Sequence, residues 1–238
     1  MGAMTVQLTD RQHELLLTIV GEYISTAQPV GSKLVAEKYL PDVSPATVRN
    51  DMAVLEYQGY VHQPYTSAGR VPTAKAYEFY VGQLAQESVL SEQIYRVLKD
   101  SAQGNDERAR LKNLAKAVIE ETGESAVIGF SPEDTFYTGI SNLFAKPEFS
   151  TMQMVVDMSR LIDHFDRIVK QLMESASQQV DILIGQQCQL SDYCSMIVSP
   201  LTLSSGTGMF GLFGLTRMDY KKNRDIVKGV ADIINKDL

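Results

Sequence analysis

The sequence predicts an α+β fold in which short helices come first and an antiparallel sheet backed by helices comes second. In the first third of the chain apolar residues recur at helical spacing, whereas the second half holds short apolar runs between polar or glycine-rich turns. The 238 residues are enough for one large domain or two small ones. We therefore expect two domains of different character.

Two helices are predicted at the start of the chain. Thr9 is a typical N-cap for a helix that runs to about Ser25, with Leu15 and Ile19 on its apolar face. The segment AQPVG breaks this helix. We expect Ser32 to cap a second, shorter helix that ends before PDV.

The limits of a third helix are clear from the sequence. Ser44 is its predicted N-cap, Pro45 occupies the first position, where a missing N–H costs nothing, and Gly59 follows as a left-handed cap. Helical spacing assigns its core stripe to Val48, Met52 and Leu55. The residues that turn the other way are Thr47, Arg49, Asn50, Ala53 and Glu56.

A small hairpin is predicted next, with YVHQPY and RVPT pairing around TSAG, where Gly69 supplies a permissive backbone. Three short helices and a hairpin are the outline of a winged helix-turn-helix, which we assign to residues 1–82. The first two turns of such a recognition helix contact bases in the major groove, and the hairpin, or wing, reaches phosphate or the minor groove.

Specific roles follow for residues of this region. We expect Asn50 to bond an adenine edge, Arg49 to bind guanine or phosphate, and Ser44 and Thr47 to bind phosphate beside the positive helix end. The wing offers Arg70 as an exposed cation in an otherwise uncharged turn.

The charge balance limits this hypothesis. The net charge of −7 argues against a protein that coats nucleic acid by bulk electrostatics. Residues 1–83 hold six Lys and Arg against eight Asp and Glu. Any DNA binding must therefore be local, and the alternative is a capped helix and hairpin that serve protein contacts.

A helical stretch follows Thr73, and SAQGND at 101–106 is its expected break. We assign 83–106 to a linking helix and linker. The apolar stripe in residues 84–100 fits either a dimerisation helix or packing between domains.

Residues 107–238 form the second predicted domain. A helix at about 107–121 precedes two strand-like segments, SAVIGF and TFYTGI, and a long helix is expected at about 151–176. Three more strand candidates, VDILIGQ, CSMIVSP and MFGLFGL, precede a closing helix. The methionine-rich long helix is either core or an adaptable partner groove, and we favour core.

Nothing in the sequence indicates an enzyme, a metal site or a cofactor. GTGMFG at 206–211 matches the dinucleotide fingerprint, but a β-like run follows it, which favours a turn between antiparallel strands. His13, His62 and His164 lie on separate predicted elements. Cys188 and Cys194 fit neither a zinc knuckle nor a redox pair, and we expect buried free thiols.

The N-terminus lacks the features of a secretory signal, and no apolar run is long enough to span a bilayer. We expect a cytoplasmic protein without a membrane partner.

Several segments together resemble one family. LTDRQ, PVGSKLV, SPATVRNDMAVLE, TSAGRVPT and YEFYV are similar to the N-terminal domain of the HrcA family, the heat-inducible transcription repressors of chaperone operons. The match is dense over residues 8–82. It resumes in TGISNLFAKPEF, ILIGQQ, CSMIVSP and GLFGLTRMDY.

The resemblance implies a homodimeric repressor that binds an inverted-repeat operator and releases it under heat stress, with the GroE chaperonin as a partner that promotes the DNA-binding state. It implies a second domain with a reduced GAF-like fold and no cofactor. The implied DNA-binding residues are Ser44, Thr47, Arg49, Asn50, Thr66, Ser67 and Arg70.

The sequence departs from the family pattern in its centre. Only SPED separates SAVIGF from TFYTGI, where family members carry further strands and a dimerising insertion. We therefore expect a shortened member with a smaller sheet, which lacks the inserted dimerising segment of the family. A winged-helix protein-interaction module with weak or lost DNA binding is the alternative.

Overall fold

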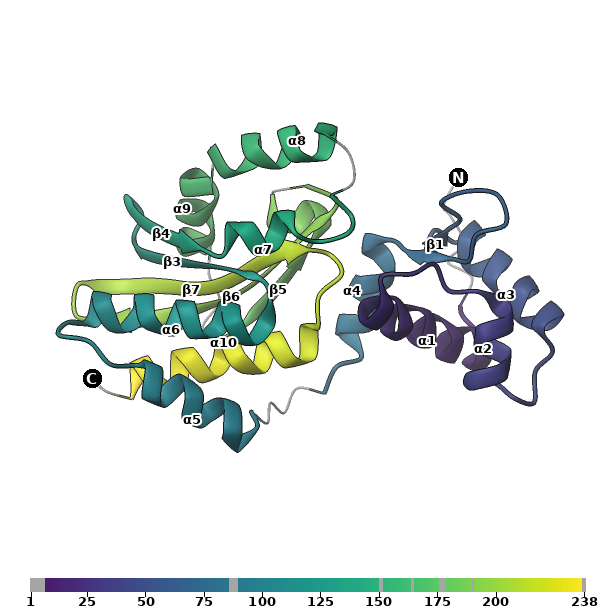
Figure 1. Cartoon of the computed structure of the whole chain (residues 1–238), viewed down its shortest axis with the longest axis horizontal. Helices are drawn as coiled ribbons and strands as arrows, with labels where there is room; N and C mark the ends of the chain where they lie inside the picture. Colours follow the sequence, from purple (N-terminus) through teal and green to yellow (C-terminus); the bar gives the residue numbers. More distant parts are fainter. Residues whose placement is uncertain are drawn as a thin grey trace. The chain divides into compact units, whose positions relative to one another are not determined.

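The computed structural model describes residues 7–85, 90–149, 152–163, 165–175, 179–189 and 191–236. The chain divides into two compact units, residues 1–84 and 85–238 (Figure 1). None of the helices in these described ranges is long and apolar enough to cross a membrane.

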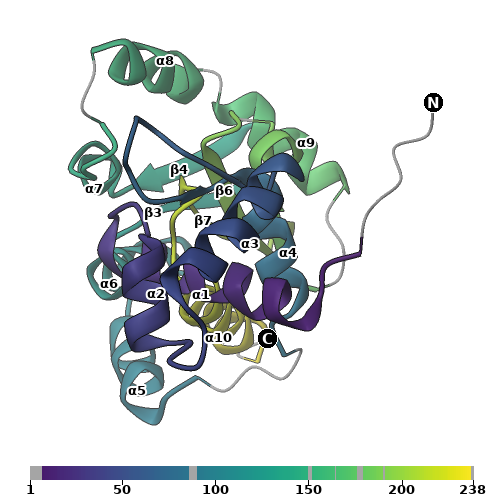
Figure 2. The same cartoon turned by 90° about the vertical axis from the view of Figure 1, so that its right-hand side faces the viewer.

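The first unit is a winged helix-turn-helix, as the sequence predicts. Its core is formed by fully buried apolar residues of the helices, among them Leu15, Ile19, Val48 and Leu55. Figure 2 shows the helices of this unit from the side of α3. Its elements are α1 (Asp10–Thr26), α2 (Ser32–Lys38), α3 (Pro45–Tyr57), β1 (Val61–His62), β2 (Val71–Pro72) and α4 (Ala74–Gly82).

The helix caps follow local hydrogen bonding. Thr9 caps α1 and forms a capping box with Gln12, which confirms its predicted role. Gly59, which follows the C-cap residue Gln58 of α3, has φ 78°, as expected of a left-handed cap. The cap predicted at Ser32 is wrong by one residue, because Gly31 is the N-cap of α2 and Ser32 already lies in the helix.

The wing hairpin is shorter than predicted, and its loop bends differently. Only Val61 and His62 pair with Val71 and Pro72 as strands, while the backbone of Arg70 pairs with Val30. The left-handed residue of the loop is Ser67, with φ 66°.

The predicted role of Gly69 is therefore corrected. Gly69 is not among the residues with positive φ. A Cβ added to Gly69 would lie 2.4 Å from the carbonyl carbon of Val30, so glycine is required by the close approach of two backbones.

The second unit is built on one antiparallel sheet with the strand order β4-β3-β7-β6-β5. Helices α6 and α10 cover one face, and α7, α8 and α9 lie on the other side (Figure 1). This is the mixed α+β arrangement that the sequence predicts, and it is GAF-like, as the resemblance implies. The strands are β3 (Ser125–Ser131), β4 (Asp134–Thr138), β5 (Asp181–Ile184), β6 (Cys194–Leu203) and β7 (Gly206–Leu215). The helices are α5 (Glu92–Ser101), α6 (Glu107–Thr122), α7 (Ile140–Phe144), α8 (Met152–Asp163), α9 (Phe165–Ser175), the 3-10 turn η1 (Gly185–Cys188) and α10 (Tyr220–Asn235).

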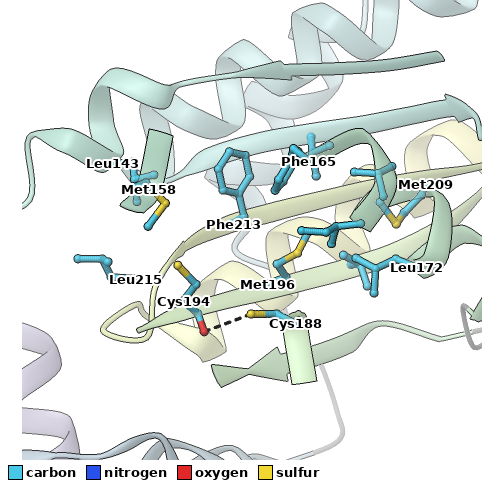
Figure 3. Packing of buried hydrophobic residues seen from close by; sticks show 14 residues of the cluster. Leu143, Met158, Phe165, Leu172, Cys188, Cys194, Met196, Met209, Phe213 and Leu215 are labelled. Carbon is cyan, nitrogen blue, oxygen red and sulfur yellow. Dashed lines mark hydrogen bonds between the residues drawn. The ribbon is translucent and has the colours of Figure 1, made fainter. Parts of the chain in front are cut away.

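An apolar core fills the space between the sheet and helices α7 to α9 (Figure 3). The rings of Phe165 and Phe213 lie 4.5 Å apart, and Met158 is buried in the same cluster. Cys188 and Cys194 are both buried with free thiols, as predicted. The methionine-rich segment thus contributes to the core.

Two helical predictions differ from the structure. The helical stretch after Thr73 breaks between α4 and α5, before the predicted break at 101–106. Helix α5 packs on α6 and α10 through the fully buried Leu98, so the segment expected as a linking helix belongs to the second unit from this helix onward. The long helix expected at 151–176 consists of α8 and α9, and His164 between them lies outside the described residues.

Two tight hairpins contain the two remaining sequence motifs, SPED and GTGMFG. β3 and β4 pair directly at Ser131 and Asp134, so a two-residue turn stands where the resemblance implies an insertion. β6 and β7 pair from Leu203 and Gly206 onward, and GTGMFG lies within β7. The motif continues as a strand to Leu215, which is the β-like run that the sequence predicts at this position.

Candidate nucleic-acid interface

The front end of α3 is fixed by its cap. Ser44 Oγ accepts a hydrogen bond from the backbone N–H of Thr47 at 3.1 Å and lies 2.9 Å from Thr47 Oγ1. Pro45 occupies the first turn, where it removes no helical hydrogen bond. Ser44 and Thr47, the two residues predicted at the helix start, are therefore bonded to each other. Ser44 is exposed and Thr47 is half-buried.

The buried face of α3 consists of Val48, Met52 and Leu55 together with one carboxylate, Asp51. Asp51 accepts hydrogen bonds from Arg11 Nε at 2.6 Å and Nη2 at 3.2 Å, and from Gln12 Nε2 at 3.4 Å. The hydrogen bond to Asp51 is the main cause of a raised pKa for Arg11. This contact ties α3 to α1 and leaves Arg49 and Asn50, which precede Asp51, on the exposed side.

Arg49 differs from the other basic residues of the first unit in the partners of its side chain. Arg11 pairs with Asp51, Lys38 with Glu22 at 3.0 Å, and Arg70 with Glu56 at 2.8 Å, whereas Lys33 has only a loose, exposed contact with Glu37 at 3.7 Å. Lys75 donates to the carbonyl of Gln58 and lies over the Tyr60 ring. Within the described ranges Arg49 has neither an ion pair nor a hydrogen bond from its side chain, so its guanidinium is available to a ligand.

A groove of about 490 Å³ lies between the start of α2, α3 and the wing. Arg49 and Met52 line it from α3, Lys33 from α2, and Gln63 and Ser67 from the wing. Its exposed cations, Lys33 and Arg49, suit an anionic ligand such as a phosphate backbone. Thr66, next to Ser67 at the wing tip, is also exposed.

The prediction of an exposed Arg70 is wrong. The Arg70 side chain is only 14% exposed and forms an ion pair with Glu56 of α3. Its backbone is held as well, because its N–H and C=O each bond to Val30 at 2.9 Å. Arg70 lies at the base of the wing, where its backbone pairs with Val30 and its side chain pairs with Glu56.

Sequence reasoning missed several residues of this region. Lys33 is an exposed cation at the start of α2, and a count of cations flanking the third helix would have found it. Gln63 donates from Nε2 to the carbonyl of Ala68 at 2.9 Å and closes the wing loop. Glu56 gave a sequence signal, since it follows Arg49 by seven residues and therefore lies on the same helix face.

The histidines do not form a site within the described residues. The ring of His13 packs edge-on against Phe79 at 5.0 Å, and His62 is exposed in β1. Among the described residues no group of three or more His, Cys, Asp or Glu side chains is arranged to hold a metal ion.

Three helices, a wing and an unpaired arginine at the front of the third helix define a protein of the winged helix-turn-helix class. Residues 7–86 match the family described as "Winged helix-turn-helix transcription repressor, HrcA DNA-binding", and residues 78–223 match "HrcA protein C terminal domain". The chain belongs to the HrcA family.

Relatives agree with this assignment. A heat-inducible transcription repressor HrcA from Pelotomaculum thermopropionicum is 42% identical over 119 residues, which are 50% of this chain and 32% of that protein. The chain thus matches about a third of the length of this relative. A second HrcA, from Carboxydothermus hydrogenoformans, is 25% identical over 96% of this chain and 98% of its own length. That alignment runs over 334 positions, so the relative carries residues without a counterpart here.

The fold also matches a solved structure. A crystal structure of a hypothetical protein superposes with a TM-score of 0.80 at 18% identity, covering 97% of this chain and 98% of that one. The likeness shows that the two chains share a fold.

Proposed function

We propose that the protein is a DNA-binding transcription repressor of heat-shock operons. The observation that carries this proposal is Arg49, an exposed arginine without an ion pair in the described residues, at the front of a capped recognition helix and beside a groove that Lys33 also lines. The family match supports it, since the matched domain is described as DNA-binding and the relatives are named heat-inducible transcription repressors.

In the proposed complex the front of α3 enters the major groove. Asn50 bonds an adenine edge, and Arg49 binds guanine or an adjacent phosphate. Ser44 and Thr47 meet phosphate at the helix start, while Thr66 and Ser67 contact the backbone from the wing tip. The contacts to bases give specificity, and those to phosphate give salt-dependent affinity.

The test is binding of the purified full chain to a duplex with the family's inverted repeat and to a scrambled duplex, at several salt concentrations. Replacing Arg49 or Asn50 by Ala should weaken specific binding by roughly 1–3 kcal/mol and reduce discrimination between the duplexes. Arg96→Ala is the matched control, because Arg96 is an exposed arginine of the second unit with its own partner, Glu92. Equal binding of both duplexes by folded wild-type protein would refute the proposal.

A dimer is part of the proposal, because an inverted repeat needs two recognition helices about one helical turn or a multiple apart. The mass of the protein in solution, with and without the duplex, tests it. A strict monomer in both measurements contradicts the inverted-repeat mechanism.

Release under heat is also part of the proposal, with the GroE chaperonin promoting the DNA-bound state. Binding to the duplex should fall on warming while the protein stays folded, and added GroE should raise it. No effect of temperature or of GroE would contradict this regulation.

A protein-interaction module is the second candidate. It is favoured by the excess of Asp and Glu in residues 1–83 and by exposed aromatic rings, Tyr57 at 91% and Tyr65 at 67% exposure. If both duplexes bind equally weakly and Tyr57→Ser abolishes binding of GroE, this candidate replaces the repressor.

A further inference from the structure

The carboxylate of Glu56 joins the recognition helix to both ends of the wing loop. Glu56 lies in the last turn of α3, and its Oε1 accepts a hydrogen bond from the backbone N–H of Gln63 at 3.1 Å. Its Oε2 pairs with Nη2 of Arg70 at 2.8 Å. Gln63 and Arg70, at the two ends of the wing loop, are therefore both bonded to the side chain of Glu56.

The loop is closed by further contacts of these residues. Gln63 Nε2 donates to the carbonyl of Ala68, and the N–H of Ala68 donates to the carbonyl of Tyr65 at 3.0 Å. The close approach of Gly69 to Pro29 and Val30 leaves the returning strand no room to shift toward that segment. Among these side-chain contacts only those of Glu56 reach α3, so Glu56 links the wing loop to the recognition helix.

We propose that Glu56 and Arg70 are a positioning pair that holds the wing against the recognition helix for DNA binding, and that Arg70 does not contact phosphate. This inference rests on the proposed function. Arg70 lines the same groove as Arg49 and Lys33, but its side chain is only 14% exposed and is already paired with Glu56, so it has little surface for a second anion. Glu56 shares a helix face with Arg49, and its pairing with Arg70 keeps an unpaired carboxylate away from the DNA.

The two roles of Arg70 predict opposite results. A residue that contacts phosphate contributes about 0.9 to the slope of log K against log salt concentration, whereas a positioning residue contributes nothing to that slope. If Arg70 met phosphate, Glu56→Gln would free it and tighten binding. If the pair positions the wing, Glu56→Gln weakens specific binding although it removes a negative charge.

The experiment measures two quantities on full-length Glu56→Gln, Glu56→Ala and Arg70→Ala. The first is hydrogen exchange of residues 63–70 in the free protein, which should become about tenfold faster in Glu56→Ala and Arg70→Ala because a charge-assisted bond is lost. The second is specific DNA affinity, which should fall about tenfold in all three variants with an unchanged salt slope. Glu92→Gln and Arg96→Ala, which change the same charges in the second unit, should alter neither quantity.

Unchanged exchange at 63–70 in Arg70→Ala together with a lower salt slope would overturn the proposal, as would tighter binding by Glu56→Gln. The exchange measurement needs no DNA, so it decides whether the pair holds the wing even if wild-type protein fails to discriminate between duplexes. Wild-type protein that does not discriminate between the duplexes would refute the proposed function, whereas the exchange result would still decide the role of the pair.

Discussion

Glu124 of the second unit is a buried carboxyl whose replacement should change how stability depends on pH. Its side chain is 4% exposed, and Oε1 accepts a hydrogen bond from Lys146 Nζ at 2.9 Å. Oε2 is buried without a hydrogen-bond partner among the described residues and faces Gly214, where an added Cβ would lie 2.4 Å from it. Burial outweighs the attraction of Lys146 and raises the pKa of Glu124 to about 7.

The sign and size of the effect follow from this pKa. Below the ordinary value of 4.5 Glu124 is protonated in both the folded and the unfolded chain, so the group adds no pH dependence. Between 4.5 and about 7 the folded chain binds the proton more tightly, and stability falls as the pH rises. At about 1.36 kcal/mol per pH unit, the loss reaches about 3 kcal/mol above pH 7.

Glu124→Gln keeps the shape and an acceptor for Lys146 but cannot ionise. Relative to wild type, this variant should gain about 2 kcal/mol between about pH 5.5 and pH 8, a range above the sequence pI of about 5.0. Urea unfolding of the full chain followed by far-UV circular dichroism at each pH measures the difference. Glu120→Gln, at an exposed position of α6, is the matched control, and its stability should depend on pH in the same way as that of wild type. A Glu124→Gln profile parallel to wild type would show that Glu124 is ionised throughout and would refute the argument.

Three further predictions concern local packing and chemistry. Gly69→Ala should destabilise the first unit by roughly 2 kcal/mol in urea unfolding, because its Cβ meets the backbone of Val30, while Gly82→Ala, in α4 with open space around it, should not. Ser44→Ala should cost about 1 kcal/mol in the same assay through the lost cap of α3. Cys194, whose pKa burial raises to about 12, should react with a thiol reagent in the native protein far more slowly than in urea, and equal rates would contradict its burial.

The parts of the fold that the sequence predicted are those set by local interactions. The cap at Ser44, the left-handed Gly59 and the apolar stripe of α3 each depend on residues within a few positions of one another. The strands of the second unit were predicted by their apolar runs. Their order in the sheet was not, because it depends on pairing between segments far apart in the chain.

The parts that the sequence missed depend on distant pairs. Asp51 contacts Arg11 across forty positions, and Glu56 contacts Arg70, yet nothing in the composition selects these partners from the other charged residues. The exposure of Arg70 was misjudged for the same reason, since its burial follows from pairing with Val30 and Glu56. Interactions of this kind appear only when the segments are placed in space.

These pairs also resolve the apparent conflict between an acidic first unit and DNA binding. Glu22, Asp51 and Glu56 each form an ion pair with a basic residue of the same unit, so part of the negative charge is neutralised within the fold. The exposed cations at the groove are then few, Arg49 and Lys33, and one copy should release few counterions on binding. Two copies on an inverted repeat would double that number. The salt slope of binding therefore also reports how many copies engage the duplex, and a slope no larger on the inverted repeat than on a half-site would contradict dimeric binding.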